Sequence, residues 1–486
     1  MSLSSAISNS LSGLTATSRA TEIVSTNISN KSVAGYARRE LDLSSRVYAA
    51  NGGGVAIDGV RRMVNAGLLG DSRISMANAA GSSAVASFHA TMETSFGTAN
   101  DSTSLVTYLT ALDTAIVSAT ARPDSDVRLQ GVLDAATELA GKIGGIAQGI
   151  SDARIAADKS IANDVGRLNT ALKRVAELNR QITSFSAQGQ DPSSLVDARQ
   201  AVLDDISSIV PIVEVTRENG RVAIFTKGGG TLLDGTTPAK IEFTAAGTIT
   251  PDMTVENGAL GTVSVNGKAL SQSEMQIFSG GSLAANFEIR DKLAPAYQEQ
   301  IDAFAREIYD RFADPSLDPS LTVGEHGLFA DGQSDFTAGT ERGLANRLSI
   351  AAEMDPAQGG QLWRIRAGRN ATDAGDAGES GLLLRMSTAL SENRSPASSA
   401  LPGAPKSLLG IASDIASQAA SLRLRSDTAS VQDQTRSEGL RTALLAEGVD
   451  TDTEMQALLT LERAYSANAK VLQTASNMLD ELLRLT

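Results

Sequence analysis

A heptad pattern of apolar side chains near the C-terminus constrains the fold more than any other feature of this 486-residue chain. Two series with a spacing of seven residues form the pattern: Leu458, Tyr465, Leu472 and Leu479, and three positions behind them Leu461, Asn468, Ala475 and Leu482. An α-helix brings residues with this 3-4 spacing onto one face. The pattern predicts a helix of roughly 45–50 Å whose seam packs against another helix.

A more polar version of the same pattern lies at the N-terminus. Apolar residues occur there at helical spacing, at Leu3, Ile7, Leu14, Val24 and Ile28, but Ser10, Thr17 and Thr21 occupy intervening seam positions. Helices are stabilised mainly by packing, so we expect both terminal segments to be weakly ordered in the free monomer and to fold with partners. The hypothesis is that they pair as a coiled-coil base, with the central domains nested between them.

Long helices are predicted for residues 74–209. Apolar residues from Ile161 to Ile182 keep a 4-3 spacing without a break, and Asp191-Pro192 is typical of the start of another helix, which Pro211 ends. Helical spacing returns from Leu293 to Phe312 and again over 407–447, whereas the short run Leu362–Arg366 looks like a strand.

The period changes to two between residues 212 and 280, which predicts an inserted all-β domain. Three Asn-Gly pairs lie in this segment, at Asn219-Gly220, Asn257-Gly258 and Asn266-Gly267. Such pairs supply the positive φ angles of hairpin turns. The expected fold class is therefore mainly α with an inserted β domain.

Composition argues against several kinds of partner. The net charge of −14 disfavours binding to nucleic acid or an anionic bilayer, and no apolar run is long enough to span a membrane. Residues 1–18 lack the basic and apolar regions of a secretory signal peptide, which leaves an intracellular location or another export route. The chain has no cysteine, which excludes disulfides and thiolate sites.

Candidate catalytic, cofactor-binding and metal residues are not found in the sequence. His89 and His326 are the only histidines, and both are interpreted as packing or surface residues. Gly228-Gly229-Gly230 follows Lys227 instead of preceding it, so a turn is a better interpretation than a phosphate loop. Residues 314–325 have the length of a calcium loop, but Pro319 stands where such a loop needs glycine. We therefore expect no enzyme, no cofactor and no metal.

Short motifs lie at both ends of the chain. Near the N-terminus, Asn27-Ile28-Ser29-Asn30 is followed by Gly35-Tyr36-Ala37-Arg38. Near the C-terminus, Glu447-Gly448-Val449-Asp450 and then Glu454-Met455 precede the helical residues Tyr465, Asn468, Leu472, Leu479 and Leu482. Together these motifs resemble the flagellar rod, hook and hook-associated axial protein family. The Gly-Tyr-x-Arg element resembles the hook-associated members more than the rod and hook proteins.

The resemblance implies a structural component that joins hook to filament and supports filament assembly by self-association. Its implied partners are further copies of itself in a ring or helical array, hook protein, an adjacent junction protein and the filament side. An export chaperone is expected on the C-terminal helix, with type III export to the flagellum outside the cell. The expected assembly residues are Ile7, Leu14, Asn27, Ile28, Asn30, Gly35, Tyr36, Arg38, Leu458, Tyr465, Asn468, Leu472, Leu479 and Leu482.

The domain boundaries expected from these patterns are 1–45 with 441–486 for the terminal coiled coil, 46–211 with 281–440 for a mainly helical domain, and 212–280 for the β domain. Three alternatives stay open. The chain could be another axial protein such as hook or rod, an exported enzyme carried on an axial scaffold, or a generic coiled-coil scaffold, although the last does not explain the paired terminal motifs.

Overall fold

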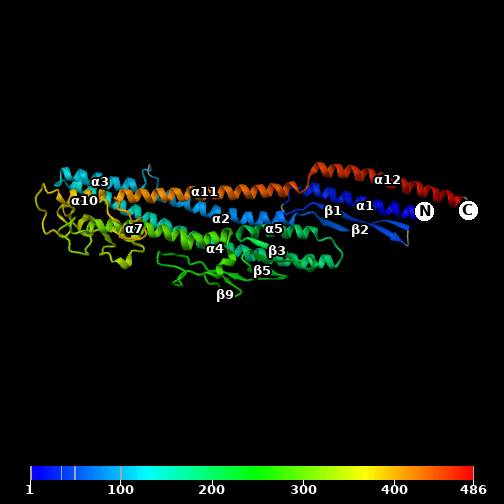
Figure 1. Cartoon of the computed structure of the whole chain (residues 1–486), viewed down its shortest axis with the longest axis horizontal. Coiled ribbons are helices and arrows are strands. Elements are labelled where there is room, and N and C mark those ends of the chain that lie inside the picture. Colours follow the sequence, from blue (N-terminus) through cyan, green and yellow to red (C-terminus); the bar gives the residue numbers. More distant parts are fainter. Residues whose placement is uncertain (1–2, 34, 49–50, 99–100, 485–486) are drawn as a thin grey trace.

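The protein is an elongated, mainly helical molecule with small antiparallel sheets (Figure 1). The computed structural model describes residues 3–33, 35–48, 51–98 and 101–484. Its α-helices are α1 (Leu3–Asn30), α2 (Ala66–Phe96), α3 (Leu105–Ala121), α4 (Asp126–Ala187), α5 (Ser193–Ile209), α6 (Gly281–Glu288), α7 (Ala294–Phe312), α8 (Leu344–Arg347), α9 (Arg364–Ala367), α10 (Gly381–Ser391), α11 (Leu408–Ala446) and α12 (Thr451–Arg484).

The strands are short except for the first two. They are β1 (Arg39–Tyr48), β2 (Asn51–Arg62), β3 (Ile212–Thr216), β4 (Val222–Thr226), β5 (Thr231–Asp234), β6 (Thr237–Pro238), β7 (Ile241–Glu242), β8 (Ser264–Val265), β9 (Lys268–Ala269), β10 (Phe329–Asp331) and β11 (Leu348–Ile350). All the pairings between them are antiparallel, in sheets ordered β1-β2, β3-β4-β5-β6, β7-β8-β9 and β10-β11.

Two groups of elements follow one another along the long axis (Figure 1). The terminal module consists of α1, the β1–β2 hairpin and α12. The body consists of everything between Ala66 and Ala446, and α2, α4 and α11 run along it. No helix in the described part of the chain is both long and apolar enough to cross a membrane.

The 62-residue helix α4 is the longest element of the body. Its apolar stripe is buried along the whole length that the 4-3 spacing predicted, from Ile161 through Leu168 and Leu172 to Ile182. Burial of each large apolar side chain contributes about 1.5–3 kcal/mol to stability. This packing stabilises a helix whose intrinsic propensity alone would not be sufficient. The helix predicted after Asp191-Pro192 is α5, where the Asp191 carboxylate accepts hydrogen bonds from the backbone amide and hydroxyl of Ser193.

The β segment packs on α4 and α5, and the apolar side chains of the sheets share one core with those helices. Two of the three Asn-Gly predictions are confirmed: Asn219-Gly220 joins β3 to β4, and Asn266-Gly267 joins β8 to β9, all four residues at positive φ. Asn257-Gly258 forms a turn that lies outside the strands, so the hairpin prediction there was wrong. The three glycines from Gly228 lie in the turn between β4 and β5, as expected.

A second core lies at the other end of the body, between α3, α4, α7, α10 and α11. Helices α6 and α7 are joined without a break by a π-helical turn over Ile289–Leu293. This turn contains Arg290, which is fully buried and forms an ion pair of 2.7 Å with Asp158 of α4. A π-turn shifts the side chains that follow it around the helix, and here it coincides with a buried charge.

Two sequence-based interpretations are corrected by the structure. The run Leu362–Arg366 is not a strand, because Trp363 and Arg364 accept the backbone hydrogen bonds of a helical turn that continues into α9. Five alternating residues are too few to distinguish a strand from a short helix. The β1–β2 hairpin over residues 39–62, conversely, was not predicted, because apolar and polar residues do not alternate regularly in this segment.

His89 is a buried packing residue, as expected from the sequence. The side chain is 5% exposed, lies beside Phe88, and shares a hydrogen bond of 3.0 Å with the Tyr297 hydroxyl. Burial lowers the pKa of His89 below its usual value and raises the pKa of Tyr297. Both shifts have the same cause, since an apolar environment disfavours the charged form of each ring.

We expect acid to destabilise the body through His89. Below about pH 6.5 the unfolded chain takes up a proton at this residue while the folded protein does not, so stability is lost as the pH falls. The loss amounts to about 1.4 kcal/mol per pH unit until the folded state also titrates. Chemical unfolding between pH 7.5 and 5 checks this against His89→Gln, which lacks the titrating group; parallel pH dependences for the two proteins would contradict it.

Candidate assembly site at the terminal junction

Helices α1 and α12 lie side by side and run in opposite directions (Figure 1). Two contacts define their register. Gly13 faces the amide of Asn468, which approaches to 2.8 Å from the position a β-carbon would take, and Asn27 donates a hydrogen bond of 3.1 Å to Glu454. This register places Leu3 opposite Met478, so that the last turns of α12 extend past the described start of α1.

The predicted seam residues are distributed unequally between buried and exposed positions. Ile7, Leu14, Ile28, Leu458, Asn468 and Leu472 are half-buried. Tyr465, Leu479 and Leu482 are exposed, at 49%, 42% and 54%. The two buried residues of α12 are Glu454 and Ala475. The monomer therefore covers only part of the predicted heptad seam.

Further apolar side chains of α12 are exposed on positions that the heptad interpretation did not include. Met455, Leu459, Val471 and Met478 are each about half exposed, at 49–51%. These residues could have been predicted from the sequence, because they place apolar side chains on more than one face of the helix, and each apolar face favours a packing partner. Apolar side chains therefore remain exposed to solvent on several sides of α12.

The motif residues of the N-terminal region meet around the first turn of α12. Asn27 is fully buried; its side-chain oxygen accepts hydrogen bonds from the Tyr36 hydroxyl (2.7 Å) and the Arg39 amide (3.0 Å). Its side-chain nitrogen donates to the Arg39 carbonyl (2.9 Å) and to Glu454. One asparagine thus holds the chain that leaves α1, the start of β1 and the start of α12 together.

Glu454 is the acceptor at the centre of this junction. It is fully buried and accepts a hydrogen bond of 2.6 Å from Arg38 Nε, while the same guanidinium also contacts Glu40. Its place in the first turn of α12 is favourable, because the free amides there attract a negative charge. Burial lowers the pKa of Arg38, but hydrogen bonds to Glu40 and Glu454 outweigh this, and the pKa is raised overall.

The other two motif positions are placed at the edge of the junction. Gly35 has a φ of +76° and lies against α5, where a β-carbon would approach to 2.6 Å from the carbonyl oxygen of Asp197. Asn30, half-buried, donates from its amide to the Thr26 carbonyl within α1. Glycine is required at position 35 for both backbone conformation and space.

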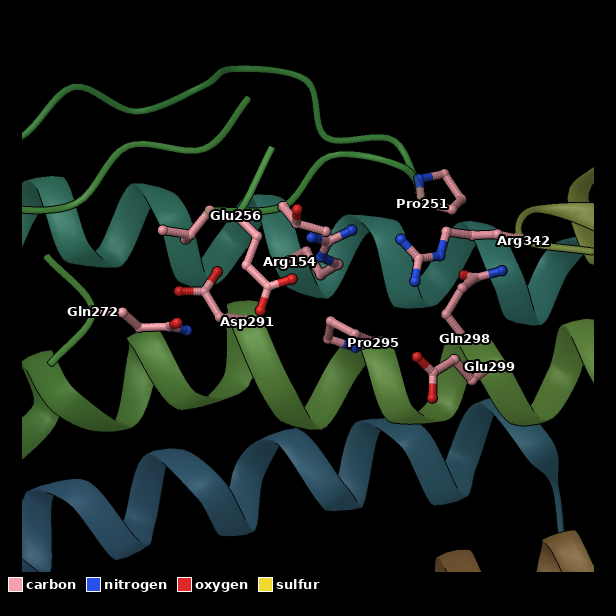
Figure 2. Close-up of a pocket in the computed structure, with 11 residues that line it drawn as sticks. Arg154, Pro251, Glu256, Gln272, Asp291, Pro295, Gln298, Glu299 and Arg342 are labelled. Carbon is pink, nitrogen blue, oxygen red and sulfur yellow. The ribbon is translucent and has the colours of Figure 1, made fainter. Parts of the chain in front are cut away.

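A pocket of about 180 Å³ lies in the body, between α4, α7 and the loop around Pro251 (Figure 2). Arg154 in this pocket donates to the carbonyl oxygens of Arg290, Thr250 and Met253, and Asp291 is paired with Arg290. These charges fasten a loop to two helices. Elsewhere too, within the ranges that the structure describes, no three acidic, histidine or cysteine side chains are grouped to hold a metal.

Comparisons with known proteins match separate parts of the chain. Residues 90–315 match the family model for the helical domain of the flagellar hook-associated protein FlgK. Residues 441–485 match the model for the C-terminal part of the flagellar basal body rod FlgEFG proteins. The second match covers the segment before α12 and α12 itself, and α12 contains Glu454.

Curated relatives agree with these matches. Flagellar hook-associated protein 1 of Escherichia coli is 24% identical over 342 residues, which are 68% of this chain and 61% of that protein. The Salmonella typhimurium protein of the same name is 26% identical over 246 residues, 49% and 44% of the two chains. The chain spans less than two thirds of the length of these relatives.

A solved structure, the flagellar hook junction protein FlgK from Burkholderia pseudomallei, aligns with a TM-score of 0.45 at 20% identity. The alignment covers 54% of this chain and 47% of that one.

Both matched regions are similar to parts of axial proteins of the bacterial flagellum. Within that class, the helical middle of the chain is similar to the helical domain of the flagellar hook-associated protein FlgK, and the curated relatives carry the name flagellar hook-associated protein 1.

Proposed function

We propose that the protein is a structural component of the flagellum, not an enzyme, that joins hook to filament and supports filament assembly. The FlgK helical domain over residues 90–315 supports this role most strongly. The curated relatives are hook-associated proteins. The burial of Asn27 and Glu454 is consistent with a structural role for the terminal motifs.

Self-association through the terminal helices is the proposed mechanism of assembly. The observation that carries it is the exposed apolar surface of α12, which includes Tyr465, Val471 and Leu479. Each such side chain contributes about 1.5–3 kcal/mol when fully buried, before the cost of ordering is subtracted. Contacts between unlike surfaces of identical subunits repeat from copy to copy, which generates a ring or a helical array.

In this proposal α1 and α12 form a coiled-coil base, with the seam residues Ile7, Leu14, Ile28, Leu458, Asn468, Leu472 and Leu482 at helix contacts within or between subunits. The proposed domains are 1–45 with 441–486, 46–211 with 281–440, and the inserted β domain 212–280. The side-by-side packing of α1 and α12 supports the first of these. The two small sheets between β3 and β9 support the last.

The proposed partners are copies of the protein itself, hook protein, an adjacent junction protein and the filament side. A cytoplasmic chaperone is proposed to cover the exposed face of α12 before type III export, because an apolar helix face promotes premature association. The site of action is outside the cell, at the hook–filament junction. Nucleic acid and membrane are not among the proposed partners, in keeping with the net charge of −14.

Deletion of the gene tests the proposed function. We expect cells that lack the protein to carry hooks without filaments in electron micrographs and to release flagellin into the medium, with both effects reversed by the gene on a plasmid. Cells without hooks would instead indicate a rod or hook component. Filaments of normal number and length would overturn the proposal.

A further inference from the structure

The terminal module and the body contact each other mainly through the loop at Gly35 and the open end of the β1–β2 hairpin, which lie on α5. They follow one another end to end (Figure 1), and in the part of the chain that the structure describes no helix of the module packs along a helix of the body. The chain crosses between them twice, over residues 63–65 and 447–450. Where the two crossings meet, Asn65 and Glu447 form an exposed hydrogen bond of 3.1 Å. With such a connection, a small number of side-chain contacts determines the angle between the terminal module and the body.

One carboxylate of the body receives most of the polar contacts from the module. Asp197, on α5, is 7% exposed. Its Oδ1 accepts hydrogen bonds from Arg62 (2.6 and 2.8 Å) and from the Ala37 amide (3.3 Å), and its Oδ2 accepts one from Arg39. The backbone carbonyl of the same residue lies against Gly35.

Arg39 and Arg62 are directly opposite each other in the register of the β1–β2 hairpin. Two like charges at such a cross-strand pair repel each other. Their side chains are only 10% and 15% exposed, so water screens this repulsion poorly. A carboxylate bound to both guanidiniums converts the repulsive pair into an attractive group of three charges. The hairpin presents that group at its open end, next to the crossing at residues 63–65.

We infer that Asp197 is a clasp that fixes the angle between the terminal module and the body. With the clasp closed, the open end of the hairpin is held on α5 and the module continues the axis of the body. Without the carboxylate, Arg39 and Arg62 repel each other and lose their attachment, and the module pivots about the two chain crossings. The clasp gives a subunit a way to adopt different angles without repacking either core.

Distance measurements between the two parts test this inference. The chain contains no cysteine, so Asn78→Cys on α2 and Ser466→Cys on α12 provide two unique sites for spin labels in the full-length protein. Both positions are exposed. We expect a single narrow distance distribution by double electron–electron resonance, and at least a doubling of its width in Asp197→Ala. The matched control is Asp205→Ala, an exposed carboxylate on the same helix, for which we expect no change.

Arg62→Gln provides a second variant on the opposite side of the clasp. This variant removes one guanidinium without altering α5. It therefore still tests the role of the clasp if circular dichroism shows that Asp197→Ala does not fold. We expect it to broaden the distribution as well, but less than Asp197→Ala, because Arg39 keeps its contact. A folded Asp197→Ala or Arg62→Gln protein with the distribution of the unsubstituted protein would overturn the inference.

Discussion

The Glu454→Ala variant is expected to lose the attachment of α12 to the rest of the terminal module. Glu454 is fully buried and binds both Arg38 and Asn27, so its removal leaves a guanidinium and an amide without their buried acceptor. Arg38 keeps Glu40 and is partly exposed, so the loss is that of hydrogen bonds to a charged group, about 1.5–3 kcal/mol. Hydrogen exchange at the first turns of α12 should accelerate by about 10- to 100-fold, since each 1.4 kcal/mol corresponds to a factor of ten.

In cells, the same variant should restore filaments in the deletion strain at least tenfold less often than the unsubstituted gene. Glu462→Ala is the control, because Glu462 is exposed on the same helix. Glu454→Gln keeps the shape and one acceptor oxygen and should give an intermediate rate of exchange. Exchange in Glu454→Ala that matches the control would mean that the junction does not hold α12.

The Arg290→Ala variant should have the largest effect on the stability of the body. Arg290 is completely buried, pairs with Asp158 at 2.7 Å and Asp291 at 2.7 Å, and lies over the rings of Phe287 and Phe243. Its removal leaves Asp158, itself 1% exposed, as a buried carboxylate without its cation. The expected loss is about 3–5 kcal/mol, which corresponds to a fall in Tm on the order of 10 °C.

Differential scanning calorimetry measures this loss, and Arg167→Ala is the matched control. Arg167 lies on α4 as Asp158 does, but its side chain is 60% exposed and its ion pair is with Asp164 at the surface. A surface pair contributes less than about 1 kcal/mol, so the control should melt close to the unsubstituted protein. Equal melting temperatures for the two variants would show that Arg290 is not needed for the body.

The long elements were predictable because many residues contribute to each pattern. The spacing from Ile161 to Ile182 is confirmed by complete burial along α4, and the helices predicted for 293–312 and 407–447 are α7 and α11. The hairpin over 39–62 was not predictable in the same way. Its register shifts after Asp42 and after Ser45, and each shift moves the side chains that follow to the other face.

The terminal junction was partly predictable. Asn27, Tyr36 and Arg38 were expected to take part in assembly because of the motif that contains them, and the structure brings all three to one place. Their partner Glu454 lies 427 positions from Asn27, and nothing in local periodicity links the two. Asp197 was equally hidden, because a charged residue on an amphipathic helix is ordinarily interpreted as solvated.

Both crossings between the terminal module and the body lie at one end of the body, and α3 and α10 lie at the opposite end (Figure 1). Residues inserted into or removed from that distal end leave the register between α1 and α12 unchanged. A lineage can therefore vary the outward reach of such a molecule while its base stays compatible with the same neighbours. The exposed residues 402–405, in the loop between α10 and α11, are accordingly a suitable place to graft a foreign domain.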